Sequence, residues 1–371
     1  MKKFLILLGG LLVAACTNSG NDVLVVNVSH PRSAMLEDLT GRINITPLDE
    51  SEVLIPNIVY AKKYGNLLFL GNTTQGLVVF NGEKAVGQLD KTGRANDEYR
   101  MLYSIAYREE TSELVIFDPV QRKLITYHVP DLVFAQSESF PFKGMVPRGQ
   151  ESVGSRYSFF FREDGPVLWD HQTHQIADSC SLSFIQAWCA NAIEPMRESD
   201  SKSLLFCIPG PISRIMRASP EGFETVREFT VQPAIGDAFW TETDEDTWHE
   251  MVIGMISSDK LALGAKDPLL KGDDAAWWYL TARGDLEEDE DIPNWNLFRT
   301  VDGKQEVYSE LHLEGYPTPI QPQIADGEQW GMVLELAILK KITNPKGPVY
   351  PRLRELADQG YEHALIMYDI L

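Results

Sequence analysis

Short apolar runs separated by polar turns recur along most of the chain. The run from Leu68 to Phe80, LFLGNTTQGLVVF, and the run from Val115 to Tyr127, VIFDPVQRKLITY, repeat one rhythm 47 residues apart (115 − 68 = 47). β-Branched and aromatic residues bounded by Gly, Asn, Asp and Pro are typical of short β-strands. The repeat predicts two copies of a module of three strands joined by turns. The residues paired by this shift are Leu68 with Val115, Phe69 with Ile116, Leu70 with Phe117, Leu77 with Leu124, Val78 with Ile125, Phe80 with Tyr127, Ile58 with Ile105 and Tyr60 with Tyr107.

Weaker copies of the module follow further along the chain. A period in the forties built from antiparallel strands indicates β-propeller blades, because one four-stranded sheet cannot cover both its faces and must stack against neighbours around an axis. The alternative is a β-sandwich, in which short strands also recur regularly. We expect an all-β propeller in residues 41–371, a length that suits six blades with insertions or seven plain blades. The weaker copies are Gly165–Ser179, Ser203–Ser219, Asp259–Arg283 and Ile324–Leu334.

The two ends of this domain are expected to meet. The last residues, 362–371 (EHALIMYDIL), have a strand pattern that runs to the end of the chain, and the early segment 41–49 (GRINITPLD) is the natural partner. Pairing of the chain ends within one blade removes free strand edges. We therefore expect these two segments to be adjacent strands that close the ring.

Three segments break the β pattern. Residues 243–257 place Trp248, Met251 and Val252 at helical spacing behind a Thr or Asp cap, although a strand that ends the fourth blade is an alternative. Residues 333–345 and 351–360 are clearer helices, and the second has Pro at its start and Gly at its end. The pattern predicts short helical insertions near the C-terminus, in the last blade.

The N-terminus has the layout of a secretory signal. Lys2 and Lys3 precede a twelve-residue apolar run that ends at Ala15, which is shorter than the roughly 20 residues of a membrane-spanning helix. Leu12 to Cys16 (LVAAC) resembles the lipobox of bacterial lipoproteins, in which the cysteine is acylated and becomes the new N-terminus. The alternative is an ordinary cleaved signal. We expect a signal peptide in residues 1–15, lipidation at Cys16 and an N-terminal tether in residues 16–40.

The net charge argues against nucleic acid as a partner. The whole chain carries a formal charge of −21, and removal of residues 1–15 with their two lysines leaves 31 − 54 = −23. Such acidity repels phosphate backbones and anionic lipid surfaces. The expected contact with the membrane is therefore the lipid anchor, and the residue after the cysteine, Thr17, is not acidic, which favours the outer membrane.

The segment between the two clear modules carries a resemblance. It reads GQLDKTGRANDEY (residues 87–99) and is followed by strands ending in VIFD and by RKLITYH. This order resembles NHL-like or TolB-like propellers, and more closely the six-bladed β-propeller lipoproteins of Bacteroides-type bacteria. The resemblance implies six blades, but residues 95–97 are Ala-Asn-Asp where the family tends to Gly-Pro. The matching positions are Gly87, Gly93, Arg94, Glu98, Tyr99 and Asp118.

Four of these positions are expected to shape an inter-blade loop. Gly93 would supply an unusual backbone angle. Arg94 and Glu98 would brace the loop beside Tyr99. A structural role is the favoured interpretation of all four residues, and a ligand site is the alternative.

The spacing of the cysteine, histidine and acidic residues along the sequence indicates metal sites only weakly. Cys180, Cys189 and Cys207 lack the paired short loops of a zinc site, and they form either one disulfide with one thiol or three thiols. Asp170, His171 and His174 lie close in sequence, for which adventitious metal binding is the simpler explanation. The acidic run of residues 285–291 is a candidate calcium site without the order of an EF-hand, and a solvated loop is the favoured alternative. We expect no cofactor.

The tryptophans offer a candidate contact surface. All eight follow residue 168, and Trp277, Trp278 and Trp295 are the residues we expect to contact a glycan or a protein partner, since exposed aromatic rings give a large contact area. Packing inside blades is the alternative. Alternation along a strand predicts that Trp277 and Trp278 point to opposite sides, one inward and one outward.

These observations favour a non-enzymatic binding or scaffold protein. It would be tethered through Cys16 to a bacterial outer membrane, face the periplasm or the cell exterior, and bind an unidentified protein or glycan. No hydrolase, nucleotide or zinc-protease motif occurs in the sequence. Propellers of this shape host metal-dependent lactonases and related enzymes, so a hydrolase or lyase that uses the central channel is one alternative. A glycan-binding module is another.

Overall fold

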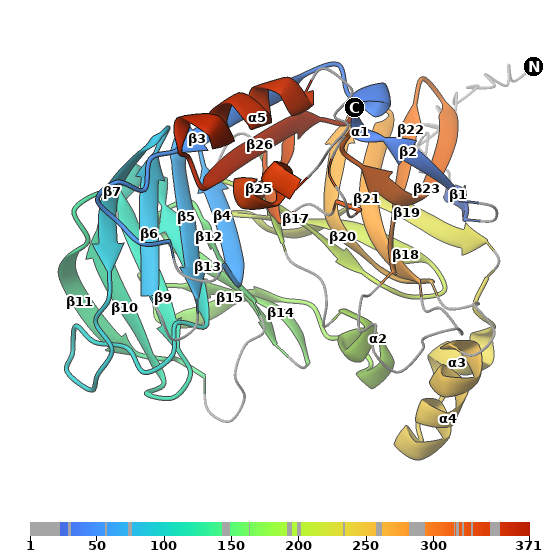
Figure 1. Cartoon of the computed structure of the whole chain (residues 1–371). Coiled ribbons are helices and arrows are strands. Elements are labelled where there is room, and N and C mark those ends of the chain that lie inside the picture. Colours follow the sequence, from blue (N-terminus) through green and yellow to red (C-terminus); the bar gives the residue numbers. More distant parts are fainter. Residues whose placement is uncertain are drawn as a thin grey trace, which may run out of the picture.

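Six small sheets, built mainly from antiparallel strands, make up the structure, which is a computed structural model. It describes residues 23–28, 31–55, 58–72, 76–142, 149–162, 164–190, 195–198, 202–232, 234–256, 262–281, 294–314, 316, 319–320, 323–327, 329–341 and 349–371. The sheets stand around one axis as the blades of a six-bladed β-propeller (Figure 1). The expected all-β fold and the count of six blades are confirmed.

Blades 1 to 3 have four strands each. Blade 1 contains β4 (Tyr60–Tyr64), β5 (Leu67–Asn72), β6 (Gly76–Asn81) and β7 (Lys84–Leu89). Blade 2 contains β8 (Ser104–Arg108), β9 (Glu113–Asp118), β10 (Lys123–His128) and β11 (Val133–Ser139). Blade 3 contains β12 (Gly149–Val153), β13 (Tyr157–Arg162), β14 (Gly165–Asp170) and β15 (Gln175–Ser179).

Blades 4 to 6 also take strands from the N-terminal part of the chain. Blade 4 contains β16 (Met196–Arg197), β17 (Leu204–Ile208), β18 (Ser213–Ser219), β19 (Gly222–Gln232) and β1 (Leu24–Asn27). Blade 5 contains β20 (Ala262–Lys271), β21 (Asp274–Thr281), β22 (Asn294–Val301), β23 (Lys304–His312) and β2 (Arg32–Met35). Blade 6 contains β24 (Ile324–Asp326), β25 (Gln329–Glu335), β26 (His363–Asp369) and β3 (Ile43–Leu48).

The 47-residue repeat corresponds to blades 1 and 2. Strands β6 and β10 begin 47 residues apart (123 − 76 = 47), whereas β4 and β8 begin 44 apart (104 − 60 = 44). The connection that contains the 3₁₀ turn η1 (Glu109–Thr111) is two residues longer than its counterpart in blade 1, and the next connection, between β9 and β10, is one residue longer. Each weaker copy falls within one of blades 3 to 6.

The core lies between the blades rather than inside one sheet. In β9, the four consecutive residues Leu114–Phe117 are all buried, because neighbouring blades cover both faces of the sheet. Residues of one parity join a core shared by blades 1 and 2, for example Ile116 with Phe69. Residues of the other parity, for example Phe117, join a core shared by blades 2 and 3. Central strands such as β9 are therefore continuously apolar, whereas outer strands such as β15 are mostly exposed.

The ring closes through the two ends of the chain, as predicted. β3 pairs antiparallel with β26, with Ile45 opposite Ile366 and Leu48 opposite His363. β3 is thus the outermost strand of a blade whose other strands come from the C-terminus. This pairing covers the edge of β26 that would otherwise be open.

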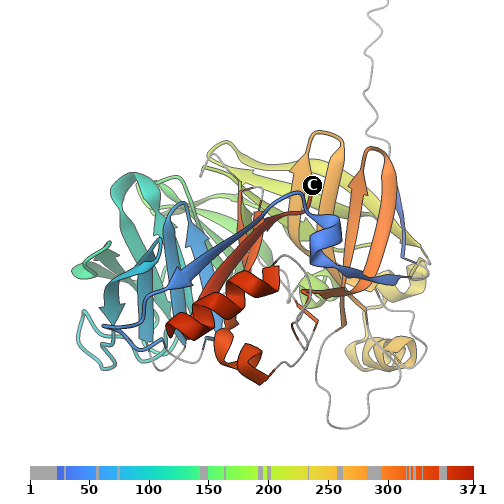
Figure 2. The same ribbon diagram turned by 45° about the horizontal axis from the view of Figure 1, so that its top comes forward.

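The N-terminal segment extends this closure along the rim. β1 adds in parallel to β19 and β2 adds in parallel to β23, so three successive blades take their outermost strand from residues 24–48. Figure 2 shows this blue segment passing from β2 through helix α1 (Leu36–Leu39) to β3. Strands β1 and β2, which lie within the tether expected at residues 16–40, therefore belong to blades 4 and 5.

The helices occupy the connections between strands. The predicted helix at residues 243–257 is α4 (Glu245–Ile256), capped by Asp244, whose carboxylate accepts a hydrogen bond from the Thr247 amide at 2.8 Å. The predicted insertion in the last blade contains α5 (Val349–Gln359). The prediction of a helix over residues 333–345 is wrong in part. Residues 333–335 end strand β25, and the 3₁₀ helix η3 (Leu336–Lys341) follows.

The three cysteines within the described residues are free thiols, and two of them, Cys189 and Cys207, are buried. Of the two alternatives left by the sequence, the structure has the three thiols. None of the helices in the described segments is both long and apolar enough to cross a bilayer.

A histidine at the closing seam should make stability depend on pH. The Nδ1 atom of His363 lies 2.8 Å from Oε1 of Glu50, beside the pair of β3 and β26. Burial acts to lower the pKa of His363, but the hydrogen bond and the charge of Glu50 outweigh it, so the pKa is raised above its ordinary value. The ion pair therefore stabilises the fold below about pH 6.5, and this contribution is lost as the pH rises through the folded pKa.

We predict that His363→Gln lowers the free energy of unfolding by roughly 1–2 kcal/mol at pH 5.5 and by less at pH 8.5. Urea unfolding at the two pH values measures the difference. His128→Gln is the control, since His128 is exposed at the end of β10. A His363→Gln deficit that grows toward high pH would contradict the assignment.

Candidate functional site

Charged side chains line the axis of the ring, around a hollow whose empty volume is about 370 Å³ with open solvent included. Lys62 extends from β4 of blade 1, and its Nζ donates to the Ile105 carbonyl of blade 2 at 3.1 Å. The same Nζ donates to the Gln150 carbonyl at 3.3 Å and to Glu151 Oε1 at 2.5 Å, both in blade 3. One ammonium group thus uses its hydrogen bonds to join three blades. Glu151 is 4% exposed at its side chain, so this ion pair is largely withdrawn from water.

Two further interactions complete the axial group. Lys63 Nζ lies 2.5 Å from Asp326 Oδ2, which links blade 1 to blade 6. The Tyr64 hydroxyl donates to Glu151 Oε1 at 2.7 Å, and the Arg197 guanidinium of blade 4 lies 4.9 Å from the centre of the Tyr64 ring. Burial, followed by the charge of Glu151, raises the pKa of Tyr64 well above its ordinary value, so the phenol stays protonated and donates.

The axis is therefore a network of matched charges. Glu151 and Asp326 are each held by a lysine, so neither presents a carboxylate that is available to a ligand at its present geometry. Within the described segments, no group of three His, Cys, Asp or Glu side chains is placed to hold a metal ion. The two ion pairs join blade 1 to blades 3 and 6.

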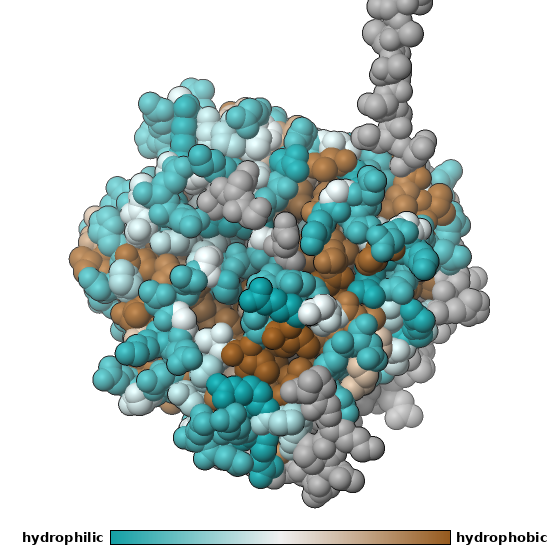
Figure 3. All heavy atoms as spheres, turned by 90° about the horizontal axis from the view of Figure 1, so that it is seen from above, coloured by the Kyte–Doolittle hydropathy of each residue, from teal (hydrophilic) through white to brown (hydrophobic). Residues whose placement is uncertain are grey.

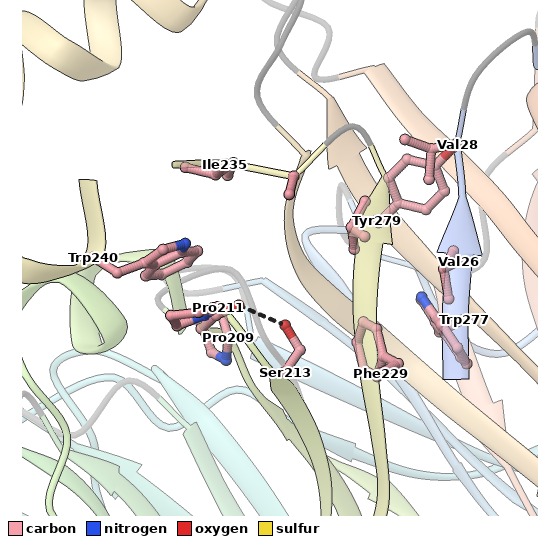
Figure 4. Close-up of a pocket in the computed structure, with 13 residues that line it drawn as sticks. Val26, Val28, Pro209, Pro211, Ser213, Phe229, Ile235, Trp240, Trp277 and Tyr279 are labelled. Carbon is pink, nitrogen blue, oxygen red and sulfur yellow. Dashed lines mark hydrogen bonds between the residues drawn. The ribbon is translucent and has the colours of Figure 1, made fainter. Parts of the chain in front are cut away.

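A second hollow lies between blades 4 and 5 and is different in character. Its empty volume is about 540 Å³ with the open solvent at its mouth included, and the enclosed part has room for about two water molecules. Figure 4 shows Phe229 and Trp277 at its base, Tyr279 and Val28 on one side, and Trp240 across from them. The lining residues are Val26, Val28, Pro209, Gly210, Pro211, Ser213, Phe229, Val231, Ala234, Ile235, Trp240, Trp277 and Tyr279.

Four separate parts of the chain build this interblade pocket. Val26 lies in the N-terminal strand β1, and Val28 follows directly after that strand. Phe229 lies in β19. Trp277 comes from β21, where its ring packs 4.6 Å from Phe229 and 4.4 Å from Phe298. Pro209 and its neighbours form the turn between β17 and β18. The pocket therefore exists only when the N-terminal strand lies on blade 4.

Helix α3 (Asp237–Thr241) supplies the lip of the pocket. Its Trp240 packs with Phe239, whose ring lies 5.0 Å away, against a small core. That core is made by α3, by α4 and by α2 (Phe184–Cys189), with Trp248 fully buried at its centre. Figure 1 shows the three helices side by side below the blades. The helices thus hold the indole of Trp240 at the opening.

The pocket has few polar groups, and none of its lining residues carries a charge. The Ser213 hydroxyl donates to the Gly210 carbonyl at 3.4 Å. Tyr279 is 3% exposed, and among the described residues its hydroxyl has no hydrogen-bond partner. Burial raises the pKa of this phenol above its ordinary value, so the hydroxyl remains a protonated donor.

The three predicted tryptophans have different surroundings. Trp277 lines the pocket and is 1% exposed, whereas Trp278 is 2% exposed and packs 5.6 Å from Trp330 in the core of blades 5 and 6. The expectation that one ring faces outward is wrong, because a neighbouring blade covers each face of β21. Trp295 lies in β22, and its side chain is outside the described part. Contact of these rings with a glycan or protein stays a prediction.

The predicted inter-blade loop joins β7 to β8. Glu98 accepts a hydrogen bond from the Ala95 amide at 2.8 Å, and Tyr99 is fully buried. Gly93 differs from expectation, because it does not have a positive φ. A Cβ atom there would lie 1.8 Å from the Glu98 carboxylate, so close approach explains the glycine. Arg94 is exposed and does not brace any part of the described chain.

The histidine-rich turn does not converge on a metal. Asp170 accepts hydrogen bonds from Arg156 at 2.6 and 3.0 Å, and this guanidinium holds the pKa of the carboxyl well below its usual range. His171 Nε2 lies 2.7 Å from Ser158 Oγ and 2.9 Å from Arg108 Nη2. These contacts join blades 2 and 3. The acidic run of residues 285–291, the candidate calcium site, lies outside the described residues.

The face of the molecule seen from above carries mostly polar side chains (Figure 3). Figure 3 shows one face on which hydrophilic residues predominate, with separate hydrophobic areas between them. Single exposed apolar side chains are normal on soluble proteins and need no partner. The large ones exposed here are Val25, Leu54, Val59, Tyr103, Val120, Val133, Ile176, Phe184 and Ile212.

Solved structures with the same architecture are distant in sequence. A "putative exported protein" from Bacteroides fragilis has a TM-score of 0.64 and 12% identity, over 94% of this chain and 99% of that chain. Kuenenia stuttgartiensis hydrazine synthase has a TM-score of 0.43 and 10% identity, over 85% of this chain and 87% of that chain. The first similarity shows the fold alone, and the second is too distant to carry an argument. No protein-family model and no curated protein matches this chain.

Sequence reasoning missed most of the interblade pocket. It singled out Trp277 but not Tyr279, which lies two residues further along the same face of β21. Two residues of one parity on a strand share a face, so this neighbour could have been found. Trp240 and the Pro209–Pro211 turn give no local signal, because they approach Trp277 only through the stacking of blades 4 and 5.

We predict that Lys62→Met destabilises the fold by about 3–5 kcal/mol, because Glu151 is left as a buried, uncompensated carboxylate. Lys91→Met is the matched control. Lys91 pairs with Asp97 at 3.1 Å on the surface, and its loss should cost less than about 1 kcal/mol. Chemical denaturation of both variants gives the comparison. Equal effects of the two substitutions would contradict a structural role for the axial pair.

Proposed function

We propose that the protein is an exported, lipid-anchored, non-enzymatic binding scaffold, and that its ligand site is the interblade pocket of blades 4 and 5. The observation that carries the proposal is the contrast between the two hollows. Lysines engage the axial carboxylates Glu151 and Asp326, whereas the pocket opens to solvent and its lining is apolar and uncharged. A site that is complete except for its ligand is the better candidate for binding.

The two alternatives receive less support from the geometry. A lactonase-like hydrolase needs carboxylates and a metal site that face the channel, but Glu151 and Asp326 are engaged by lysines. A glycan-binding surface needs exposed aromatic rings, but Trp277 and Trp278 are buried. Binding through the pocket requires neither feature.

The proposed location is the outer membrane of a bacterium, with the propeller facing the periplasm or the cell exterior. It rests on the signal layout of residues 1–15 and on the lipobox-like segment that ends at Cys16. Seven residues, 17–23, separate that cysteine from β1. At about 3.5 Å per residue, the anchor would hold the rim of blade 4 within roughly 25 Å of the bilayer surface.

We predict that Cys16→Ala abolishes lipidation while the propeller still folds. The wild-type chain, expressed in a Gram-negative host with an alkyne fatty acid, should be labelled and should sediment with the outer membrane. The variant should be unlabelled and should be missing from the outer-membrane fraction, with an unchanged melting temperature. Equal labelling of the two proteins, or equal amounts of them in the outer membrane, would contradict the proposed anchor, whatever the pocket binds.

A further inference from the structure

We infer that the mouth of the interblade pocket belongs to a larger docking surface, and that its partner is a basic amphipathic segment of another protein. The inference rests on the proposed binding role of this pocket and adds the class of its partner. The docking surface is formed by α2, by the turn between β17 and β18, and by α3 and α4. Its apolar centre consists of Phe184, Pro211, Ile212, Ile235 and Trp240.

The parts of the docking surface contact one another. The side-chain amide of Gln186 in α2 donates to the Pro209 carbonyl at 3.1 Å, which joins α2 to the turn. The Phe184 ring of α2 lies 5.4 Å from the Trp248 ring of α4. Figure 4 shows Trp240 of α3 close to the same turn, and Figure 1 shows the three helices on one side of the blades. The surface is therefore continuous from α2 across the turn to α3.

The centre of the docking surface exposes large apolar side chains. Ile212 is 47% exposed and Phe184 is 43% exposed. They differ from single exposed apolar residues, because the exposed Pro211 and the half-buried Trp240 belong to the same surface. The enclosed part of the pocket has room for only about two water molecules. A partner therefore gains its contact area around the mouth and does not need to enter the hollow.

The rim of the docking surface is acidic. Residues 234–256, which contain α3 and α4, include six Asp or Glu residues and no Lys or Arg. Asp237 begins α3. The exposed acidic residues within α4 are Glu245, Asp246 and Glu250. A partner that covers the apolar centre brings its own rim against these carboxylates, so Lys and Arg side chains around an apolar stripe complement the surface.

The same charge argues against two other occupants. A second copy of the chain would bring the same six acidic residues to the contact, because a twofold interface joins one surface patch to itself. An anionic membrane surface would be repelled by α3 and α4. A basic protein segment is the occupant that gains from both the apolar centre and the acidic rim.

A short helical peptide of Leu and Lys, with all leucines on one face, is a suitable probe. We predict that this peptide, labelled with fluorescein, binds the full-length mature protein saturably in an anisotropy titration. Binding should weaken severalfold between about 50 and 300 mM NaCl, because salt screens exposed charges. A peptide of the same composition, with the leucines spread around the helix, should bind about tenfold more weakly.

Substitutions in the apolar centre locate the binding. Ile212→Ser should weaken it by about threefold to tenfold, since it removes exposed apolar area. Trp240→Ala should weaken it by more than about tenfold. The matched control is Ile176→Ser, because Ile176 is 43% exposed but lies in β15 of blade 3, outside the docking surface. Melting temperatures establish that the variants are folded, and Ile212→Ser keeps the test informative if Trp240→Ala is unstable.

Substitutions in the rim test the charge separately. A triple variant with Glu245→Gln, Asp246→Asn and Glu250→Gln should weaken binding by roughly threefold to thirtyfold and reduce its salt dependence. A control triple variant with the same change in net charge should bind nearly as the wild type does. Its substitutions lie in exposed hairpin turns outside the docking surface and are Glu83→Gln, Glu221→Gln and Asp273→Asn.

The outcomes separate the partner class from the site. Equal binding of an analogous peptide of Leu and Glu, or equal effects of the two triple variants, would overturn the basic class of the partner. A loss of binding in Trp240→Ala but not in Ile212→Ser would overturn the larger surface and keep the mouth of the pocket as the site. Absence of saturable peptide binding would overturn the inference, and binding unchanged in both variants would overturn the proposed use of the pocket as well.

Discussion

The pairing of β3 with β26 is the constraint on which the rest of the structure depends. Each blade buries both of its faces against neighbours, so a ring with one uncovered blade would expose two apolar surfaces at once. The last blade is complete only when residues 43–48 lie against residues 363–369. Lys62 reinforces the closed ring from inside, because it can reach blades 2 and 3 only when the inner strands surround the axis.

Closure at the rim also creates the candidate binding site. The same N-terminal segment that supplies β3 first runs along blades 4 and 5, and there it contributes Val26 and Val28 to the interblade pocket. The axis and the pocket therefore have opposite roles. Lysine–carboxylate pairs hold the centre together, whereas the periphery keeps a small apolar hollow that opens to solvent.

The sequence predicts the features that depend on local order. The repeat of blades 1 and 2, the pairing of the chain ends and helix α5 follow from apolar runs, turns and caps. It does not predict that β1 and β2 join blades 4 and 5, because four-residue strands such as LVVN have no local mark of a partner some 200 residues away. Alternation places Trp277 and Trp278 on opposite faces of β21 as predicted, but neither ring is exposed, because neighbouring blades cover both faces. Lys62 and Glu151, 89 residues apart, meet only through the ring.

Hydrogen–deuterium exchange of the full-length mature protein tests the closed ring most directly. The account predicts that the amides of residues 43–48 are protected as strongly as those of residues 363–369, and that both segments exchange together through global unfolding. Fast exchange of residues 43–48 while residues 363–369 and the other blades remain protected would contradict it, because the ring would then stay folded without its N-terminal strand.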